Sequence, residues 1–167
     1  MSETERKRPR GNRVRTVQEF RHDTYKLKAK LPEPTICPTC GACYSKGRWV
    51  WQRRPDGDVH EHTCPACQRI ADRYPAGVIT LTGTFVDAHR DEIMNLVNNS
   101  AEAERAEHPL NRIMAIEEDG GAVVVSTTDI HLPRRIGKAL HDAWHGDLDV
   151  HYDEEGYFVR VGWSRAD

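Results

Sequence analysis

With 167 residues, the chain has room for one ordinary domain or two small ones. Charged residues make up 30% of it and hydrophobic residues 38%, and no apolar run approaches the ~20 residues that span a bilayer, which excludes a membrane-embedded protein. The first fifteen residues contain no apolar stretch of the secretory kind, and they include Glu3 and Glu5, which are unusual in transit peptides. We therefore expect a cytoplasmic protein that makes no membrane contact.

The net charge of −2 conceals a strong asymmetry along the chain. Residues 1–54 carry 14 Lys and Arg against 5 Asp and Glu, a balance of +9, whereas residues 55–167 carry 10 against 21, a balance of −11. A basic front half of this kind favours contact with a polyanion, although a purely solubilising tail would have the same composition.

The composition divides the chain into three consecutive segments. Residues 1–34 hold few aliphatic side chains and cannot bury enough apolar surface to offset the entropy of ordering, so we expect a disordered basic tail. Residues 35–75 hold the cysteines, and residues 76–167 have the mixed pattern of an α+β domain.

Two C-x2-C pairs lie in the middle segment: Cys37 with Cys40, and Cys64 with Cys67. A C-x2-C turn directs two thiolates to one side, and Zn²⁺ takes four such ligands at tetrahedral corners. Residues 41–63 are enough for two strands and a loop between the pairs. The spacing therefore predicts a zinc ribbon with one structural zinc ion, because four thiolates leave no open position for catalysis.

Three nearby side chains compete as ligands. Cys43 extends the first pair into a C-x2-C-x2-C run, which iron–sulfur proteins also use, but that interpretation leaves Cys64 and Cys67 without a role. His60 and His62 alternate in a probable strand, and we interpret both as surface residues.

Basic and aromatic residues alternate between the cysteine pairs. Arg48, Trp49, Arg53 and Arg54 are candidate RNA contacts, because guanidinium groups bind phosphate and indole rings stack on unpaired bases. The alternative is that the tryptophans pack the ribbon against the next domain. Six further candidates lie in the tail: Arg6, Lys7, Arg8, Arg10, Arg13 and Arg15.

The third segment has a readable order of elements. Alternation predicts a strand at 78–86, and a helix follows from Asp87 to about Glu107. Two further strands, at 112–118 and 122–127, flank a turn at Asp119-Gly120-Gly121. A second helix begins near 128–133 and ends at Gly146, and strands at 147–152 and 157–163 close the chain. The order is βαββαβ with one extra strand, which predicts a ferredoxin-like domain after the zinc ribbon.

No catalytic constellation is present in the sequence. It contains no phosphate-binding glycine loop and no nucleophile elbow, and His141 and His145 lack the glutamate of a metalloprotease motif. We expect a protein that is not an enzyme.

The cysteine pairs followed by Arg73-Tyr74-Pro75-Ala76-Gly77 and the strand and helix order above resemble a known family. Residues 35–163 resemble the N-terminal part of the nonsense-mediated-decay protein three family, the large-ribosomal-subunit export adaptor of eukaryotes and archaea, and the chain looks like a bacterial relative. The resemblance implies binding to the ribosome or ribosomal RNA. The chain has one cysteine quartet and lacks the family's later domains, so export is not implied.

The leading hypothesis is therefore a zinc-binding protein that docks on ribosomal RNA or the ribosome through its tail and ribbon, with the acidic domain available to a protein partner. The alternative is a regulatory adaptor whose zinc ribbon joins protein partners without RNA.

Overall fold

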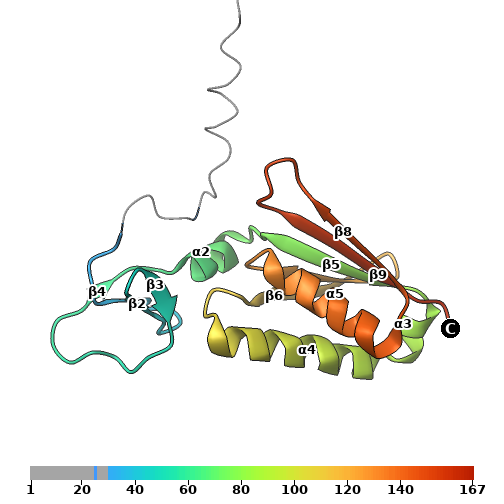
Figure 1. Cartoon of the computed structure of the whole chain (residues 1–167), viewed down its shortest axis with the longest axis horizontal. Helices are drawn as coiled ribbons and strands as arrows, with labels where there is room; N and C mark the ends of the chain where they lie inside the picture. Colours follow the sequence, from blue (N-terminus) through green and yellow to red (C-terminus); the bar gives the residue numbers. More distant parts are fainter. Residues whose placement is uncertain (1–24, 26–29) are drawn as a thin grey trace, which may run out of the picture.

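The computed structural model describes Tyr25 and residues 30–167. Two separate sheets lie on either side of helix α2 (Pro65–Asp72), as Figure 1 shows. The expected disordered tail lies almost entirely outside the described residues. No helix in the part of the chain that is described has the length and apolar character needed to cross a membrane.

The smaller sheet and α2 form what we term the cysteine unit, residues 35–72. Its strands are β1 (Thr35–Ile36), β2 (Cys43–Ser45), β3 (Arg48–Val50) and β4 (His60–Glu61), in the order β3-β2-β1-β4. β1, β2 and β3 pair antiparallel, and β4 lies parallel to β1. The turn between β2 and β3 contains Lys46 and Gly47, both at positive φ, the backbone region that tight hairpins use.

The second unit, residues 77–164, is termed the α/β unit. Its elements are β5 (Gly77–Thr82), α3 (Thr84–Ala88), α4 (Arg90–Glu107), β6 (Ile113–Asp119), β7 (Ala122–Thr127), α5 (His131–Trp144), β8 (Asp147–Tyr152) and β9 (Val159–Ser164). α4 and α5 lie on one face of the sheet (Figure 1). The result is a two-layer mixed α+β structure.

The sheet order is β6-β7-β5-β9-β8. A ferredoxin-like sheet would place the strand after the second helix beside β5, running antiparallel to it. Here that strand, β8, lies at the edge of the sheet. β9 lies between β8 and β5 and runs parallel to β5. The ferredoxin-like order is therefore not confirmed. The burial pattern explains the difference: β9 contributes Val159, Val161 and Trp163, which are at most 2% exposed, whereas β8 carries Asp147 and Asp149.

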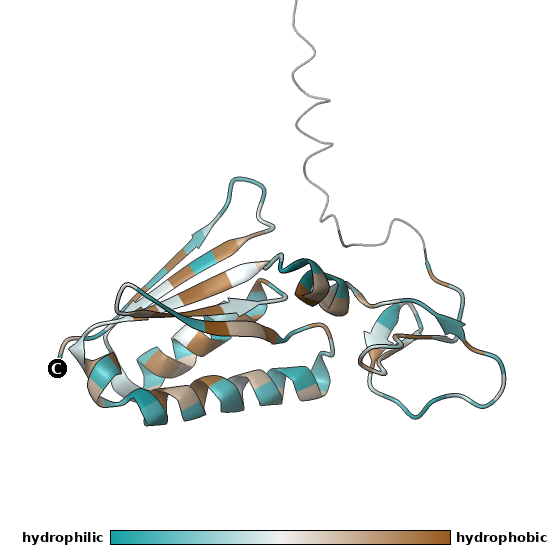
Figure 2. Ribbon diagram, turned by 180° about the vertical axis from the view of Figure 1, so that it is seen from behind, coloured by the Kyte–Doolittle hydropathy of each residue, from teal (hydrophilic) through white to brown (hydrophobic). Residues whose placement is uncertain are grey.

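The core lies between the helices and one face of this sheet. Ile79 and Leu81 of β5, Val123 and Val125 of β7, and Trp163 of β9 are buried against Ile93, Val97, Leu132, Ile136 and Leu140 of the helices. Figure 2 shows hydrophobic and hydrophilic residues alternating along the strands. The run of valines in β7 also alternates in burial, so β7 is not a strand buried on both faces.

Two boundaries differ by three residues or more from the sequence prediction. The strand expected at 78–86 ends at Thr82, because Gly83 adopts φ +108° against the backbone of Arg165, and 84–88 then form α3. The helix expected from Asp87 begins at Arg90. On α5, His141 is only partly exposed, and its Nδ1 is buried without a partner within the described residues.

We predict that Leu140→Ala lowers the free energy of unfolding by about 2–5 kcal/mol, because the side chain is fully buried and its loss leaves a cavity. Chemical denaturation measures the effect. Lys138→Ala is the matched control on the same helix, since the Lys138 side chain is 75% exposed. Similar losses in both variants would contradict this orientation of α5.

Candidate metal centre

Four cysteines converge in the cysteine unit. The sulfurs of Cys37, Cys40, Cys64 and Cys67 all lie within 4.8 Å of one another, and Cys40 Sγ is 3.8 Å from Cys64 Sγ. A metal with four thiolate ligands at about 2.3 Å in tetrahedral geometry requires sulfur separations of about 3.8 Å. The residues therefore fit a single ion, and the sequence prediction of these four ligands agrees with the geometry.

The first pair lies on the turn that joins β1 to β2. The amide of Gly41 donates to the Cys37 carbonyl at 2.9 Å, and the amide of Cys37 donates to the Ala42 carbonyl at 2.9 Å. Gly41 has φ +82°, a conformation that few other residues adopt. This turn has the form expected of a C-x2-C knuckle.

The second pair differs from the expected knuckle, because it lies at the start of α2. Cys64 is the N-cap residue, its sulfur accepts a hydrogen bond from the Cys67 amide at 3.4 Å, and Pro65 follows in the first turn. Proline suits that position, and the helix dipole favours negative charge on the capping thiolate. Since the pair lies on a helix, the zinc-ribbon prediction is not confirmed in this detail.

A fifth group reaches the sulfurs from the other unit. The guanidinium of Arg112, in the segment before β6, donates from Nη2 to Cys64 at 3.2 Å and to Cys40 at 3.5 Å, and from Nη1 to Cys67 at 3.4 Å. Arg112 is only 8% exposed. Four thiolates and a divalent ion carry a net charge of −2, and this cation offsets part of it.

Arg112 is itself held in place by the α/β unit. Its Nε donates to the Pro109 carbonyl at 2.8 Å, and its amide donates to Thr128 Oγ1 at 2.9 Å. The amide of Thr128 donates back to the Arg112 carbonyl at 2.9 Å. The guanidinium therefore lies in a fixed position between Pro109 and the loop that follows β7.

The pKa values of the thiols reflect this buried setting. Burial alone would raise the pKa of Cys37, but the amides of Cys64, Cys40 and Thr39 lower it to about 6. Burial raises the pKa of Cys64, and it also raises that of Cys67 despite the hydrogen bond from Arg112. Burial likewise opposes the charge on Arg112, yet the cysteines raise the pKa of its guanidinium above the usual value. Four thiolates in this space need the charge of a bound ion.

The competing ligands are placed elsewhere. Cys43 is buried with its sulfur 3.7 Å from the Gln52 carbonyl and 3.8 Å from the Gly41 carbonyl, and it is not part of the four-cysteine group. His60 is exposed on β4, as expected. His62 is only partly exposed, and its Nε2 is buried without a partner within the described residues, so the surface position expected for it is wrong.

The residues proposed to contact RNA divide into three groups. Arg48, Arg53 and Arg54 are exposed. Trp49 is 8% exposed and packs edge-on against Tyr44, with ring centroids 5.6 Å apart. Its ring is part of the core of the cysteine unit and is not open to a base, so the expectation of a stacking role for Trp49 is wrong. Arg6, Lys7, Arg8, Arg10, Arg13 and Arg15 lie outside the described residues.

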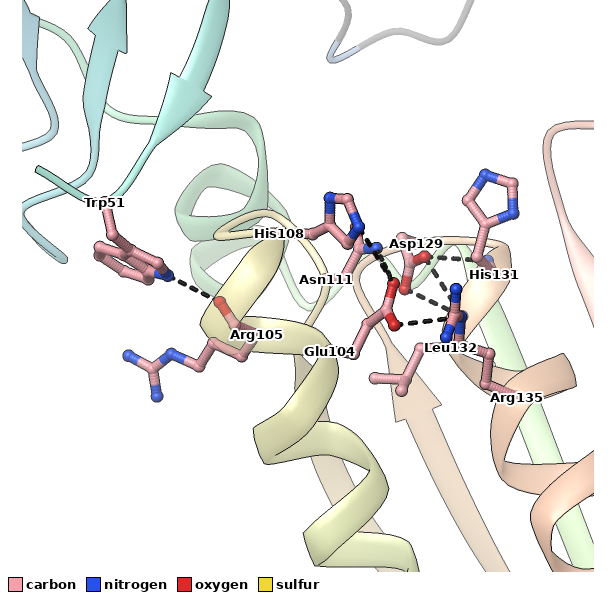
Figure 3. Close-up of polar contacts among 9 residues, drawn as sticks. All are labelled: Trp51, Glu104, Arg105, His108, Asn111, Asp129, His131, Leu132 and Arg135. Carbon is pink, nitrogen blue, oxygen red and sulfur yellow. Dashed lines mark hydrogen bonds and ion pairs between the residues drawn. The ribbon is translucent and has the colours of Figure 1, made fainter.

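Trp51 joins the two units, as the alternative interpretation of the tryptophans predicted. Its Nε1 donates to the Arg105 carbonyl near the end of α4 at 2.6 Å, and the Arg105 guanidinium lies 5.7 Å from the indole ring (Figure 3). Together with Arg112, it fixes the cysteine unit against the α/β unit.

The geometry places four cysteines where they can bind one metal ion in a closed centre. Comparison with known proteins gives no family: no family model, no curated protein and no solved structure matches the chain. Sequence reasoning missed Arg112, which is 45 residues from Cys67 and carries no local motif that would mark it.

We predict that Cys64→Ser abolishes stoichiometric metal binding, whereas Cys43→Ser leaves it intact. Serine is a good N-cap, so the Cys64 variant keeps the capping interaction of α2 and loses only the thiolate ligand. Elemental analysis of the purified proteins measures the content. Full metal in the Cys64→Ser protein would contradict the centre.

We also predict that Arg112→Ala weakens metal affinity by about 10–100-fold, the usual effect of removing a group that supports the ligands. Arg112→Lys should retain part of the affinity, since it keeps the charge but not the forked donors. Competition against a chelator measures both. Arg160→Ala, at an exposed site on β9, is the control, and an equal affinity for all four proteins would show that Arg112 does not support the centre.

Proposed function

We propose that the chain is a cytoplasmic, non-catalytic protein that holds one structural Zn²⁺ and binds ribosomal RNA or the ribosome through its basic front half. The observation that carries the proposal is the closed thiolate centre joined to a cationic surface. Full coordination by Cys37, Cys40, Cys64 and Cys67 leaves no open position for a substrate, which favours a structural zinc over a catalytic one.

The cysteine unit offers the cations for this contact. Arg48 lies on β3, and Arg53 and Arg54 lie in the segment after it, all exposed. Their charges therefore face solvent, where phosphate groups could reach them.

Tyr25 packs against α2 and the segment that follows it. Its hydroxyl donates to Asp72 Oδ2 of α2 at 2.7 Å, its ring lies 6.0 Å from that of Tyr74, and the Arg69 guanidinium lies 4.4 Å from its centroid. Tyr25 is the described residue nearest in sequence to the basic segment 6–15. These contacts place Tyr25 beside α2 of the cysteine unit. In the proposal, the basic segment and the cysteine unit bind one polyanion together.

The proposal of the ribosome as the particular polyanion rests on the resemblance to the nonsense-mediated-decay protein three family. The residues that support it are the two C-x2-C pairs and the segment 73–77 that leads into β5. RNA phosphate supplies the charge that the basic half requires.

We predict that deleting residues 1–15 weakens co-sedimentation with ribosomes and flattens its salt dependence. Each lost phosphate contact should lower the slope of log affinity against log salt by about 0.7–0.9. Replacing Arg48, Arg53 and Arg54 with Gln should weaken binding further, while metal content and melting stay unchanged.

A charge-matched control separates this contact from net charge. Changing Arg134, Arg135 and Lys138 to Gln removes three cations from the α/β unit, and ribosome binding should remain. If the truncated protein co-sediments like the full chain at every salt concentration, the electrostatic docking proposal fails.

A further inference from the structure

The α/β unit has an open edge at β8. Within the described residues, β8 pairs with β9 on one side and with no strand on the other. Its backbone donors and acceptors on that side are available, and an unpaired edge of this kind is a template for a further strand.

A groove follows this edge between β8 and α5. Leu148, Val150 and Tyr152 are opposite the buried β9 residues Trp163, Val161 and Val159, so they point to the helix-bearing face. The helices do not cover the end of the strand: Val150 is 37% exposed and Tyr152 is 45% exposed. Leu148 and Val150 help to line a cavity of about 450 Å³ against α5.

Gly137 sets the depth of the groove. A Cβ at this position would lie 2.7 Å from Leu148 Cδ1 and 3.0 Å from Val161 Cγ1. The absence of a side chain lets α5 approach β8 and β9 closely. The next turn of α5 then forms a wall beside the edge strand.

This wall is cationic in an otherwise acidic unit. His131, Arg134, Arg135 and Lys138 line the cavity from α5. Arg135 is oriented by the buried Glu104, whose Oε2 is 3.0 Å from its Nε, and Asn111 Nδ2 donates to the other oxygen at 2.9 Å (Figure 3). Arg134 lies 5.9 Å from the Tyr152 ring and has no carboxylate partner among the described residues. Its charge is available to a ligand.

We propose that this groove binds an extended protein segment with acidic side chains, which adds to the sheet as a strand beside β8. Main-chain hydrogen bonds to the edge would hold it, and alternate side chains would enter the groove. Alternate residues of a strand are about 6.8 Å apart, and Arg134 and Lys138, one turn apart, are separated by about 6 Å along the helix. Arg134 has no carboxylate partner among the described residues, whereas Lys138 forms an ion pair with Asp142 and would share its charge with an incoming carboxylate. A segment with acidic residues at every second position therefore matches the spacing of both cations.

Nucleic acid fits the same edge poorly. Asp147 and Asp149 project from the opposite face of β8, and Asp153, Glu154 and Glu155 follow at the end of the strand. These carboxylates lie on the other face of the edge strand and in the segment that follows it, where they would repel a phosphate backbone, whereas a peptide can place its acidic groups on the α5 side alone. The occupant is thus a protein, and its binding does not depend on the proposed ribosome contact.

The test uses full-length, metal-loaded, ¹⁵N-labelled protein and an acetylated peptide of alternating Glu and Val. We expect the peptide to shift the amides of Asp147–Tyr152 and to slow their hydrogen exchange. The double variant Arg134→Glu with Lys138→Glu should bind it at least about ten-fold more weakly and should gain affinity for the matching Lys-Val peptide. Arg160→Glu, on the other face of the sheet, should bind like the parent protein.

Three results would overturn the proposal. One is no change at the β8 amides up to about 1 mM peptide. Another is a stronger response of those amides to a single-stranded oligoribonucleotide than to the peptide. The third is a dimer of the free protein that the double variant dissociates, which would make a second copy the occupant. Ribosome co-sedimentation of the double variant, measured in parallel, distinguishes failure of this groove from failure of the basic half.

Discussion

The contact between Arg112 and the cysteine sulfurs is the interaction on which the arrangement of the whole molecule depends. One guanidinium reaches Cys40, Cys64 and Cys67 while its own backbone is paired with Thr128 of the α/β unit. Neither group is stable alone in this position, because a buried cation and buried thiolates each carry a large desolvation cost. A bound metal ion would compensate the desolvation cost of the buried thiolates. Arg112 would then offset part of the negative charge that remains on the centre.

The contact between Arg112 and the cysteine sulfurs joins the two units. The cysteine unit has only short strands, the longest of three residues, and a small core of Tyr44, Trp49 and the cysteines. A metal ion bound by the four cysteines would therefore supply much of its stability. Leu110 packs against that core from the α/β side, and Trp51 donates to the end of α4. A bound ion would therefore stabilise the interface as well as the centre. Loss of the ion would leave Arg112 buried without counter-charge and would loosen the contact between the units.

Local chemistry was readable from the sequence, and long-range pairing was not. The ligands follow from C-x2-C spacing, and the ends of β7 and β8 follow from turn residues and alternation, because each signal lies within a few residues. The position of β9 depends on burial across the sheet, since Val159, Val161 and Trp163 displace the more polar β8 to the edge. Arg112 was missed for the same reason: its partners are brought to it only by folding.

The basic residues of the acidic half show why the two proposed contacts belong to different units. Most of these cations are already engaged inside the molecule: Arg69 with tyrosine rings, Arg90 with Glu118, Arg105 with Trp51, Arg112 with the sulfurs, Arg135 with Glu104, Lys138 with Asp142 and Arg165 with Phe85. A long polyanion would find few free charges there and many carboxylates. The exposed arginines of the cysteine unit form no ion pair among the described residues, which supports the proposed phosphate contact at that end. On the wall of α5, Arg134 has no carboxylate partner among the described residues, and its free charge beside the open strand supports the proposed short acidic segment at the other end.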